Sequence, residues 1–292
     1  MIEVRILRDA AEADAFRIAT FPSFRHWLDF DPGWPAPIAV GTRMGGEMSG
    51  LALATPCDDG TADLLSVYCV PDRRRRGLAA ALLEQLESEC RARGLSALKG
   101  TYMTGQPATQ AFEGLLAHRG FAPPELRMLV VRATLSSIAP APWIQPRRLP
   151  SGYEIVPWVS LSPALRGELA TSHSADPWIA PDLVPFDFEE GIDPVTSTAL
   201  LVKGNVRGWC LNHAVGGVLR YTCAFVHPRL QRLGRVLWLY RAAVERMPGA
   251  GFDTGMWTIP VWHCGHANFA REHMAPYAVF FGETRGFRKA LA

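Results

Sequence analysis

The pattern of apolar and polar positions predicts two similar successions of strands and helices along the chain. In the first half, residues 9–20 are rich in alanine with acidic residues early, which predicts a helix. Strands are predicted wherever apolar residues alternate with polar ones or form short runs. These ranges are 3–7, 38–42, 48–54, 63–70, 97–103 and 126–133. The last range is expected to close the first sheet.

The same order starts again in the second half. A helix is predicted at 163–170, and a hairpin turns at Gly204-Asn205. The strands of this half are predicted at 153–156, 198–203, 206–212 and 219–226. Between the halves, four prolines in residues 136–150 disfavour regular structure and indicate a linker. We therefore expect domains at 1–135 and 151–292, joined by this linker.

The candidate chemistry begins where the strand at 63–70 ends. Pro71 stops the strand, the arginines 73–76 follow, and Gly77 precedes an amphipathic run rich in alanine and leucine. A helix that starts at such a turn presents free backbone N–H groups, and its dipole favours anions. The turn therefore predicts a site for a phosphate or pyrophosphate, although an arginine run can also be only a solvated surface.

The second half repeats this spacing. Arg74 lies three residues after Pro71, and Gln231 lies three residues after Pro228. Gly77 and Gly234 lie six residues after the same prolines. Each copy is followed by an amphipathic stretch that we expect to end in a Gly-Phe pair, at 120–121 in the first and 286–287 in the second. A domain-sized duplication is the simplest explanation.

Composition narrows the class of protein. The 292 residues are 48% hydrophobic and 20% charged, which fits two globular domains and not a disordered chain. A net charge of +2 gives no argument for nucleic acid or membrane partners. The chain has no apolar stretch long enough for a membrane span, and its six cysteines lack the spacing of a disulfide framework, so we expect a cytoplasmic protein.

The order of elements in each half resembles the GNAT acyltransferases. It consists of a strand, the pattern V-x-P-x-x-(Arg/Gln)-x-x-Gly-x-(Gly/Ala), a helix, and then a strand and a helix before Gly-Phe. The first half matches the pattern through Arg74, Gly77 and Ala79. The second half matches at Gln231 and Gly234 but not at its last position. The resemblance implies an α/β fold of two tandem GNAT-like domains. Each would have a central mixed, mostly antiparallel sheet flanked by helices.

The resemblance also implies an acyl-CoA site in the first half. The end of the central strand would bind the pantetheine arm, and the turn and the helix start would hold the pyrophosphate. The residues at these positions are Tyr68, Cys69, Val70, Arg74, Arg75, Arg76, Gly77, Leu78 and Ala79. In the second half Val236 places two methyl groups where the pattern has Gly or Ala, so we expect this copy to be degenerate.

The catalytic acid of the family is harder to assign. A tyrosine often stands four residues before the glycine of the Gly-Phe pair, where this chain has Leu116 and Gly282. We propose Tyr102 as a substitute donor to the thiolate, and Asp63 or Glu47 as relays for the proton of the amine. For each of these the alternative is an ordinary structural side chain.

The segment 263–266, His-Cys-Gly-His, lacks the ligand spacing of a known zinc site, so no metal is expected. The leading prediction is an N-acyltransferase that uses acetyl-CoA, or another acyl-CoA, and a small-molecule amine acceptor. The alternatives are a protein or peptide N-acetyltransferase and a non-catalytic CoA-binding or interaction module. We expect a monomer or homodimer, with no nucleic acid or membrane as partner.

Overall fold

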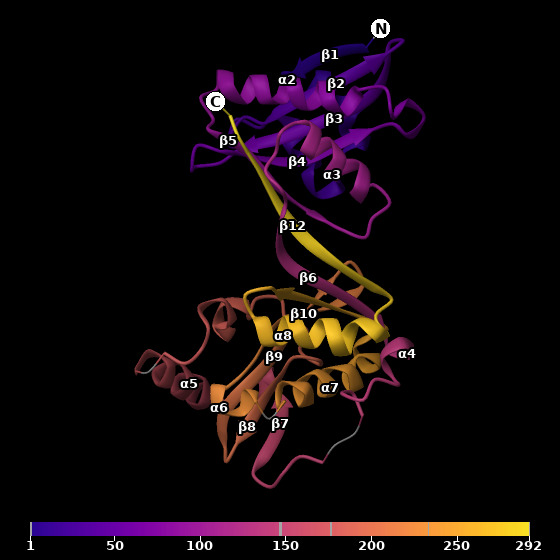
Figure 1. The fold of residues 1–292 in the computed structure, drawn as a ribbon. Helices are drawn as coiled ribbons and strands as arrows, with labels where there is room; N and C mark the ends of the chain where they lie inside the picture. Colours follow the sequence, from indigo (N-terminus) through magenta and orange to yellow (C-terminus); the bar gives the residue numbers. More distant parts are fainter. Residues whose placement is uncertain (1, 146–147, 176, 233, 292) are drawn as a thin grey trace. The chain divides into compact units, whose positions relative to one another are not determined.

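The computed structural model describes residues 2–145, 148–175, 177–232 and 234–291 (Figure 1). It consists of two compact units, one formed by residues 1–127 with 284–292 and the other by residues 128–283. The strands of the first unit are β1 (Ile2–Leu7), β2 (Ile38–Met44), β3 (Glu47–Pro56), β4 (Ala62–Cys69) and β5 (Ala97–Met103). Its α-helices are α1 (Ala10–Ala13), α2 (Leu78–Ala92) and α3 (Thr109–His118), with 3₁₀ turns η1 (Asp14–Ala19), η2 (Pro22–Asp29) and η3 (Pro71–Arg73).

Two strands carry residues of both units, β6 (Glu125–Thr134) and β12 (Phe280–Ala290). The other strands of the second unit are β7 (Tyr153–Pro157), β8 (Thr198–Val202), β9 (Asn205–Val215), β10 (Val218–Val226) and β11 (Thr254–Pro260). Its α-helices are α4 (Leu135–Ile138), α5 (Pro163–Ala175), α6 (Pro228–Gln231), α7 (Val236–Arg246) and α8 (Cys264–Phe269). Its 3₁₀ turns and one π-turn are η4 (Trp158–Ser160), η5 (Pro181–Leu183), η6 (Pro185–Phe188), η7 (Pro248–Ala250), η8 (Ala270–Met274) and η9 (Ala275–Tyr277).

The sheet of the first unit has the strand order β1-β2-β3-β4-β5-β12. Neighbours pair antiparallel except β4 and β5, which are parallel. The helix α2 packs on one face because its leucines recur at helical spacing, with Leu82, Leu83 and Leu86 fully buried. The opposite face is covered by η1 and η2, through Phe16 and Leu28. We refer to these two surfaces as the α2 face and the η1 face.

The last strand of the chain completes this first sheet. Residues 284–290 of β12 pair antiparallel with β5, from Thr284 opposite Met103 to Ala290 opposite Ala97. Phe287 is buried in the core on the α2 face, where it meets Phe112 and Phe121 edge to face. The first unit is therefore built from both ends of the sequence.

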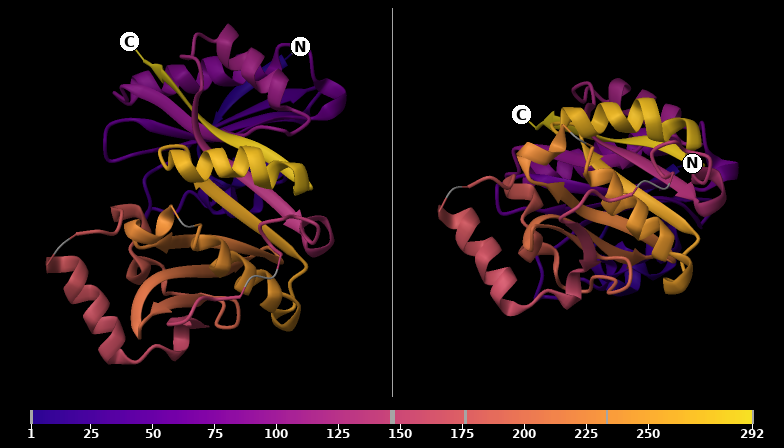
Figure 2. Two further views of the ribbon diagram at one scale, coloured as in Figure 1. Left: turned by 60° about the horizontal axis from the view of Figure 1, so that its bottom comes forward. Right: turned by 90° about the horizontal axis from the view of Figure 1, so that it is seen from below.

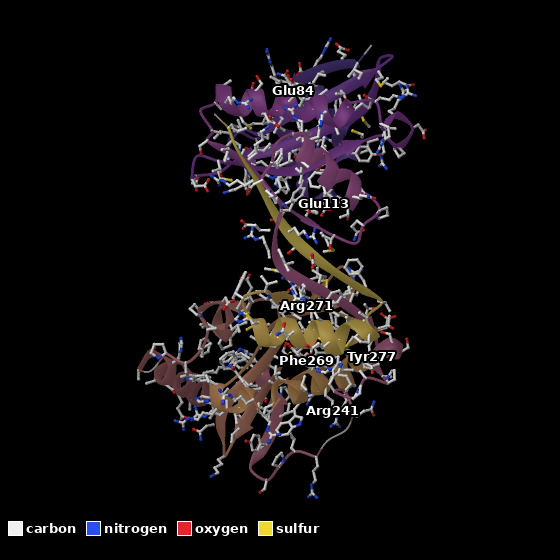
Figure 3. All side chains as sticks on the ribbon, in the orientation of Figure 1. Glu84, Glu113, Arg241, Phe269, Arg271 and Tyr277 are labelled. Carbon is white, nitrogen blue, oxygen red and sulfur yellow. The ribbon has the colours of Figure 1, made fainter. Side chains whose placement is uncertain are left out.

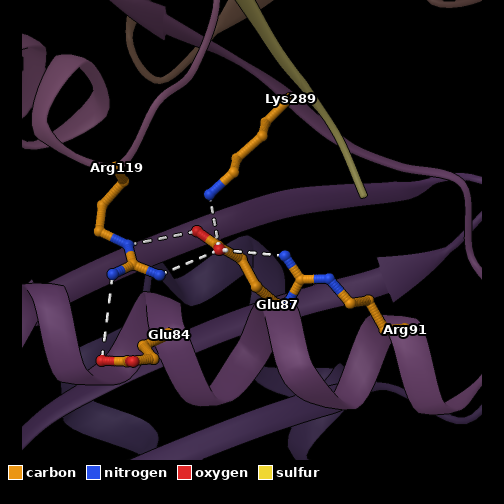
Figure 4. A network of polar contacts seen from close by, with 5 residues as sticks. All are labelled: Glu84, Glu87, Arg91, Arg119 and Lys289. Carbon is orange, nitrogen blue, oxygen red and sulfur yellow. Dashed lines mark hydrogen bonds and ion pairs between the residues drawn. The ribbon is translucent and has the colours of Figure 1, made fainter. Parts of the chain in front are cut away.

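A buried carboxylate fastens β12 to the first unit (Figure 4). Glu87 on α2 is only 2% exposed, and Lys289 of β12 places its Nζ 2.7 Å from Glu87 Oε2. Arg119, just after α3, donates from Nη2 to the same oxygen at 3.0 Å. Arg91 lies 3.8 Å away, one turn along α2. Because one carboxylate faces several cations, a charge that would otherwise be costly to bury is compensated.

The sheet of the second unit has the order β6-β11-β10-β9-β8-β7. Its parallel pair is β10 with β11, and β6 pairs antiparallel with β11. Tryptophans fill much of its core, with Trp158, Trp209 and Trp257 each at most 2% exposed. In the two views of Figure 2, α5 lies at the periphery of this unit.

Three expectations about the middle and the end of the chain were wrong. Residues 126–133 do not simply close the first sheet, because β6 pairs with β11, as in Leu129 opposite Ile259. Gly286-Phe287 does not end a helix, because it lies inside β12. The linker is partly helical, since α4 begins at Leu135 with a Thr134 capping box. The units consequently divide at 127/128 and 283/284, and not on either side of 136–150.

The duplication is visible in the register of the strands. The parallel pairing in the first unit contains Ala62 opposite Leu98, and its counterpart in the second contains Leu219 opposite Gly255. Each central strand also has a bulge, with Leu65 extra on β4 and Thr222 extra on β10. These two residues are as far apart in the sequence as Pro71 and Pro228. With this same sequence separation, Gly120-Phe121 of the first copy corresponds to Tyr277-Ala278 in the second copy, and not to Gly286-Phe287.

Candidate active site

The turn between β4 and α2 has the backbone of an anion site. Gly77 caps α2 with φ of +81°, and Arg75 is also left-handed with φ of +62°. No side chain caps the helix, and its first i→i−4 bond runs from Ala81 N to Gly77 O at 3.0 Å. The amides of residues 77–80 therefore have no acceptor within the helix. An added Cβ at Gly77 would meet no atom within 4 Å, so backbone conformation and not space requires glycine here.

The motif arginine has a local role in this turn. Arg74 donates from Nε to the carbonyl of Cys69 at 3.1 Å. In the second copy Gln231 donates from Nε2 to the carbonyl of Val226 at 3.1 Å. Each bond ties the motif side chain to the end of the central strand. The guanidinium of Arg74 thus positions the turn, and both Arg74 and Arg75 line the cleft described below.

The parallel strands β4 and β5 separate after a short contact. Only Ala62 with Leu98 and Asp63 with Lys99 are paired, although both strands continue beyond them. The backbone groups of β4 from residue 64 onward therefore lack a partner strand on this side. The bulge at Leu65 lies at the start of this gap. Free amides at a bulge can donate to a carbonyl that enters the gap.

A cleft of about 2190 Å³ opens at this gap, and all its lining residues belong to the first unit. Its lining includes Tyr68 and Cys69 at the end of β4, and residues 77–80 at the start of α2. Burial raises the pKa of the Cys69 thiol, so this thiol stays protonated at neutral pH. Val70, the next residue, donates its amide to Ser49 O at 3.0 Å. Seven of the nine predicted CoA-binding residues thus line the cleft, and Val70 and Arg76 do not.

Tyr102 lines the cleft from β5 and is part of a polar group. Its hydroxyl donates to Glu113 Oε1 at 2.6 Å, and Arg285 Nη1 donates to the same oxygen at 2.9 Å. Glu113, labelled in Figure 3, lies on α3, and Arg285 lies on β12. Burial and the bond to Glu113 raise the pKa of Tyr102 to about 12. The hydroxyl therefore keeps its proton at neutral pH.

Asp63 and Glu47 have different surroundings. Asp63 lines the cleft and lies opposite Lys99 in the short parallel pairing. Glu47 begins β3, is 75% exposed and forms an ion pair of 2.7 Å with Arg73. The structure brings Asp63 and Tyr102 to one cleft and places Glu47 in a surface pair.

The corresponding gap in the second unit holds aromatic rings. Trp257 stands at the position of Gly100, and it stacks on Tyr221 with ring centroids 4.2 Å apart. Tyr221 and Trp257 also form an additional pair of the parallel ladder, so β10 and β11 stay together one position longer. Arg235, before α7, lies 4.0 Å from the ring centroid of Trp238. In the second unit, aromatic rings thus lie at the position of the gap, and one cation of the turn, Arg235, contacts an aromatic ring of the same unit.

The His-Cys-Gly-His segment points its imidazoles at different partners. His263 Nε2 lies 2.8 Å from Asp182 Oδ2, and His266 Nε2 lies 2.9 Å from the hydroxyl of Tyr240. Burial lowers the pKa of His266 to about 4. Across the ranges that the structure describes, no three His, Cys, Asp or Glu side chains are grouped to hold a metal ion.

Glu113 and Arg285 were missed by the sequence reasoning. Glu113 stands in the predicted amphipathic stretch, so its spacing from Tyr102 could have suggested a partner. Arg285 had no such signal, because pairing of β12 with β5 cannot be read from a local pattern. The bulge at Leu65 likewise has no signature in residue type.

Comparison with known proteins identifies the fold. Residues 4–115 match the family model described as "Acetyltransferase (GNAT) family". A tandem GNAT protein from the clavulanic acid biosynthesis pathway is 16% identical, with a TM-score of 0.58 over 100% of this chain and 99% of its own. A GCN5-related N-acetyltransferase from Sphaerobacter thermophilus is 18% identical, with a TM-score of 0.59 over 99% and 96%. A search of curated proteins gave no match.

Within the described ranges, no helix combines the length and apolarity needed to cross a bilayer.

The family match covers the β4–α2 turn and the gap beside β4, and the fold match extends over both units. The repeated turn, the bulge and the parallel pair fit the same assignment. The chain therefore has the fold of a tandem GNAT protein, and the match to the GNAT family model lies within its first unit.

Proposed function

We propose that the first unit transfers an acyl group, most simply acetyl, from acyl-CoA directly to the amine of a small molecule. The observation that carries this proposal is the combination of uncapped amides at residues 77–80 with an open gap beside β4 in one cleft. Acetyl-CoA, when bound, supplies the activated thioester. The remaining chemistry is positioning and proton transfer by the chain's own residues.

The residues around the cleft fit the parts of CoA. The amides of residues 77–80 would hold the pyrophosphate, since a helix N-terminus favours anions. Arg75 and Arg76 add positive charge beside the turn. The exposed edge of β4 at Tyr68 and Cys69 would bind the pantetheine amides as a neighbouring strand would, whereas the amide and carbonyl of Val70 already bond to Ser49 and Arg73. The free amides at the Leu65 bulge would stabilise charge on the acyl oxygen.

Two side chains are assigned to proton transfer. The amine attacks the acyl carbon, the C–S bond breaks, and a proton must leave the nitrogen while another reaches the sulfur. Tyr102 is assigned as donor to the sulfur, because its raised pKa keeps it protonated. Asp63, on the η1 face, is assigned to take the amine proton through water. Glu113 and Arg285 hold the Tyr102 hydroxyl and act as positioning residues.

The second unit is proposed to be a degenerate copy that does not bind CoA. Its aromatic pair at Tyr221 and Trp257 occupies the position that is Leu64 and Gly100 in the first unit. Protein or peptide acetylation would predict an acidic groove, whereas this cleft is lined by five Lys or Arg side chains and by only two carboxylates, Asp63 and Glu125. The charge of the cleft therefore favours a small-molecule acceptor.

Calorimetric titration with acetyl-CoA tests the assignment of the two units. We expect Gly77→Trp to abolish binding, because the side chain would be added at a left-handed position in the pyrophosphate turn. The matched variant Gly234→Trp, at φ of +63° in the second copy, should leave affinity within about twofold. Equal loss from both variants, with both melting curves unchanged, would contradict the assignment. Binding without transfer to any amine would favour the non-catalytic module.

A further inference from the structure

The η1 face of the cleft carries positive charge away from the proposed pyrophosphate site. Lys99 and Thr101 of β5 alternate with Leu98, Gly100 and Tyr102, which point to the α2 face. Arg288 of β12 likewise alternates with Phe287 and with Lys289, which reaches Glu87 on α2. Lys99 and Arg288 are opposite one another in the β5–β12 ladder, and both line the cleft.

Arg127 is held flat on this surface. A Cβ at Gly286 would lie only 3.0 Å from Arg127 Cδ, so the arginine crosses β12 where glycine leaves room. Its Nη1 donates to Thr101 Oγ1 at 3.4 Å, which directs the guanidinium over β5. A larger residue at position 286 would displace it. The close approach gives a long side chain a defined place in the lining of the cleft.

These three cations differ in their counter-ions. Lys99 is paired with Asp59 at 2.7 Å. Within the part of the chain that the structure describes, neither Arg127 nor Arg288 forms an ion pair with a carboxylate. An unpaired guanidinium that is positioned in a cleft favours a carboxylate or phosphate as ligand.

The other wall on this face is aromatic. Phe21 and Phe24 line the cleft from η2 and the residue before it, with ring centroids 6.0 Å apart in an edge arrangement. Phe21 is 64% exposed although it is a large apolar side chain. Leu65 and Tyr68 continue this apolar wall along β4. A ligand between the two walls would meet rings on one side and cations on the other.

We propose that the acceptor amine also carries an anionic group, a carboxylate or a phosphate, which Arg127 and Arg288 bind on the η1 face. This inference rests on the proposed function and names the class of its acceptor. The same cations would disfavour the protonated form of the amine, and only the neutral amine can attack the acyl carbon. The anionic group therefore draws the substrate into a region where its own ammonium is destabilised.

Matched pairs of amines test the proposal with the full-length chain. L-Phenylalanine and 2-phenylethylamine differ by a carboxylate, and glucosamine 6-phosphate and glucosamine differ by a phosphate. We expect the anionic member of at least one pair to bind, measured by calorimetry, about tenfold or more tightly than its neutral partner. The pair that shows the preference distinguishes carboxylate from phosphate. Thiol release from acetyl-CoA is measured in parallel.

Arg127→Gln and Arg288→Gln should each remove most of this preference while leaving the affinity for the neutral member unchanged. Arg8→Gln, an exposed arginine outside the cleft, is the charge-matched control. Equal affinity within both pairs, no binding of either anionic member, or unchanged preference in the variants would overturn the proposal. If anionic amines bind with this preference and no amine releases thiol, the proposed function fails, and with it the role of these amines as acceptors, while the anion-binding role of Arg127 and Arg288 stands.

Discussion

At the residue scale, the partners of Tyr102 decide what its hydroxyl can do. The tyrosine position typical of the family is Leu116 here, and that side chain is 1% exposed in the core. Tyr102 instead reaches the cleft from β5, and its hydroxyl is bound to Glu113, which Arg285 also contacts. A phenol whose pKa is raised to about 12 is a weak acid but is fully protonated over the working range.

Substitution of Tyr102 by Phe tests this role. We expect kcat to fall by about tenfold to a hundredfold, which is typical of a lost general acid, with the Kd for acetyl-CoA unchanged. Tyr153→Phe in the second unit is the control. Glu113→Gln should lower the pKa of Tyr102 and move any loss of activity at alkaline pH to lower pH. A kcat unaffected by Tyr102→Phe would exclude the tyrosine as donor.

His266 predicts a dependence of stability on pH. Burial lowers its pKa from 6.5 to about 4, so the folded second unit favours the neutral imidazole. The stabilisation is fully present above pH 6.5 and is lost as the pH falls toward 4, because the unfolded chain then binds the proton more tightly. The loss should be about 3 kcal/mol in the free energy of unfolding.

Urea titrations across that pH range measure this loss. His266→Gln should flatten the slope of stability against pH. The exposed His273→Gln, on the same stretch of helix, should not. An unchanged slope in His266→Gln would assign the acid sensitivity to other groups.

At the element scale, the local sequence pattern predicted where strands lie better than it predicted which strands pair. Residues 38–42, 63–70 and 97–103 were predicted as strands and form β2, β4 and β5, because alternation and turn residues are local signals. The helix expected at 9–20 is one α-turn followed by the 3₁₀ turn η1. Pairing of β12 with β5 was missed because register depends on contacts that no sequence window contains.

The candidate site likewise has parts that local sequence predicts and parts that it does not. The pyrophosphate turn at 74–79 could be read from glycine, arginine and spacing, since backbone conformation limits the residue types there. Asp63 and Tyr102 could be named only as candidates, because their roles depend on strands that separate. Arg127 and Arg285 could not be found, since β6 and β12 were assigned to other places in the fold.

The Glu87 cluster predicts how firmly β12 is attached. Glu87→Ala leaves the positive charges of Lys289 and Arg119 together without their carboxylate, and we expect the free energy of unfolding of the first unit to fall by about 3 kcal/mol. Glu84→Ala is the matched control on the same helix. Glu84 is 73% exposed and lies 4.0 Å from Arg119, so its loss should cost about 0.5 kcal/mol or less. Similar losses in the two variants would refute a special role for the buried carboxylate.

At the scale of the whole molecule, neither half of the sequence contains a complete unit. Residues 284–290 supply an edge strand to the first sheet, and residues 128–134 of β6 supply one to the second. Each of these strands also accepts a backbone hydrogen bond from its unit: Ala122 N donates to Arg288 O of β12 at 3.0 Å, and Val279 N donates to Arg132 O of β6 at 2.8 Å. The two halves are therefore interdependent in their folding.

A fragment of residues 1–135 should accordingly fail to bind acetyl-CoA. It lacks Phe287, whose ring is 5% exposed in the core, and the strand that carries it. We expect a peptide of residues 280–292 added in trans to restore part of the binding, measured by calorimetry, and Phe287→Ala in that peptide to abolish the rescue. Full affinity in the fragment alone would show that the exchanged strand is dispensable.

The position of β12 also has a consequence for synthesis. Lys289 and Glu87 are separated by 202 residues, so the ion pair that fastens β12 cannot form until the chain has been synthesised through residue 289. The nascent N-terminal half would leave the ribosome with an unsatisfied sheet edge at β5, and contacts of such long range fold slowly. Acetyl-CoA could then be captured only by chains that already include β12, which would keep products truncated before this strand inactive.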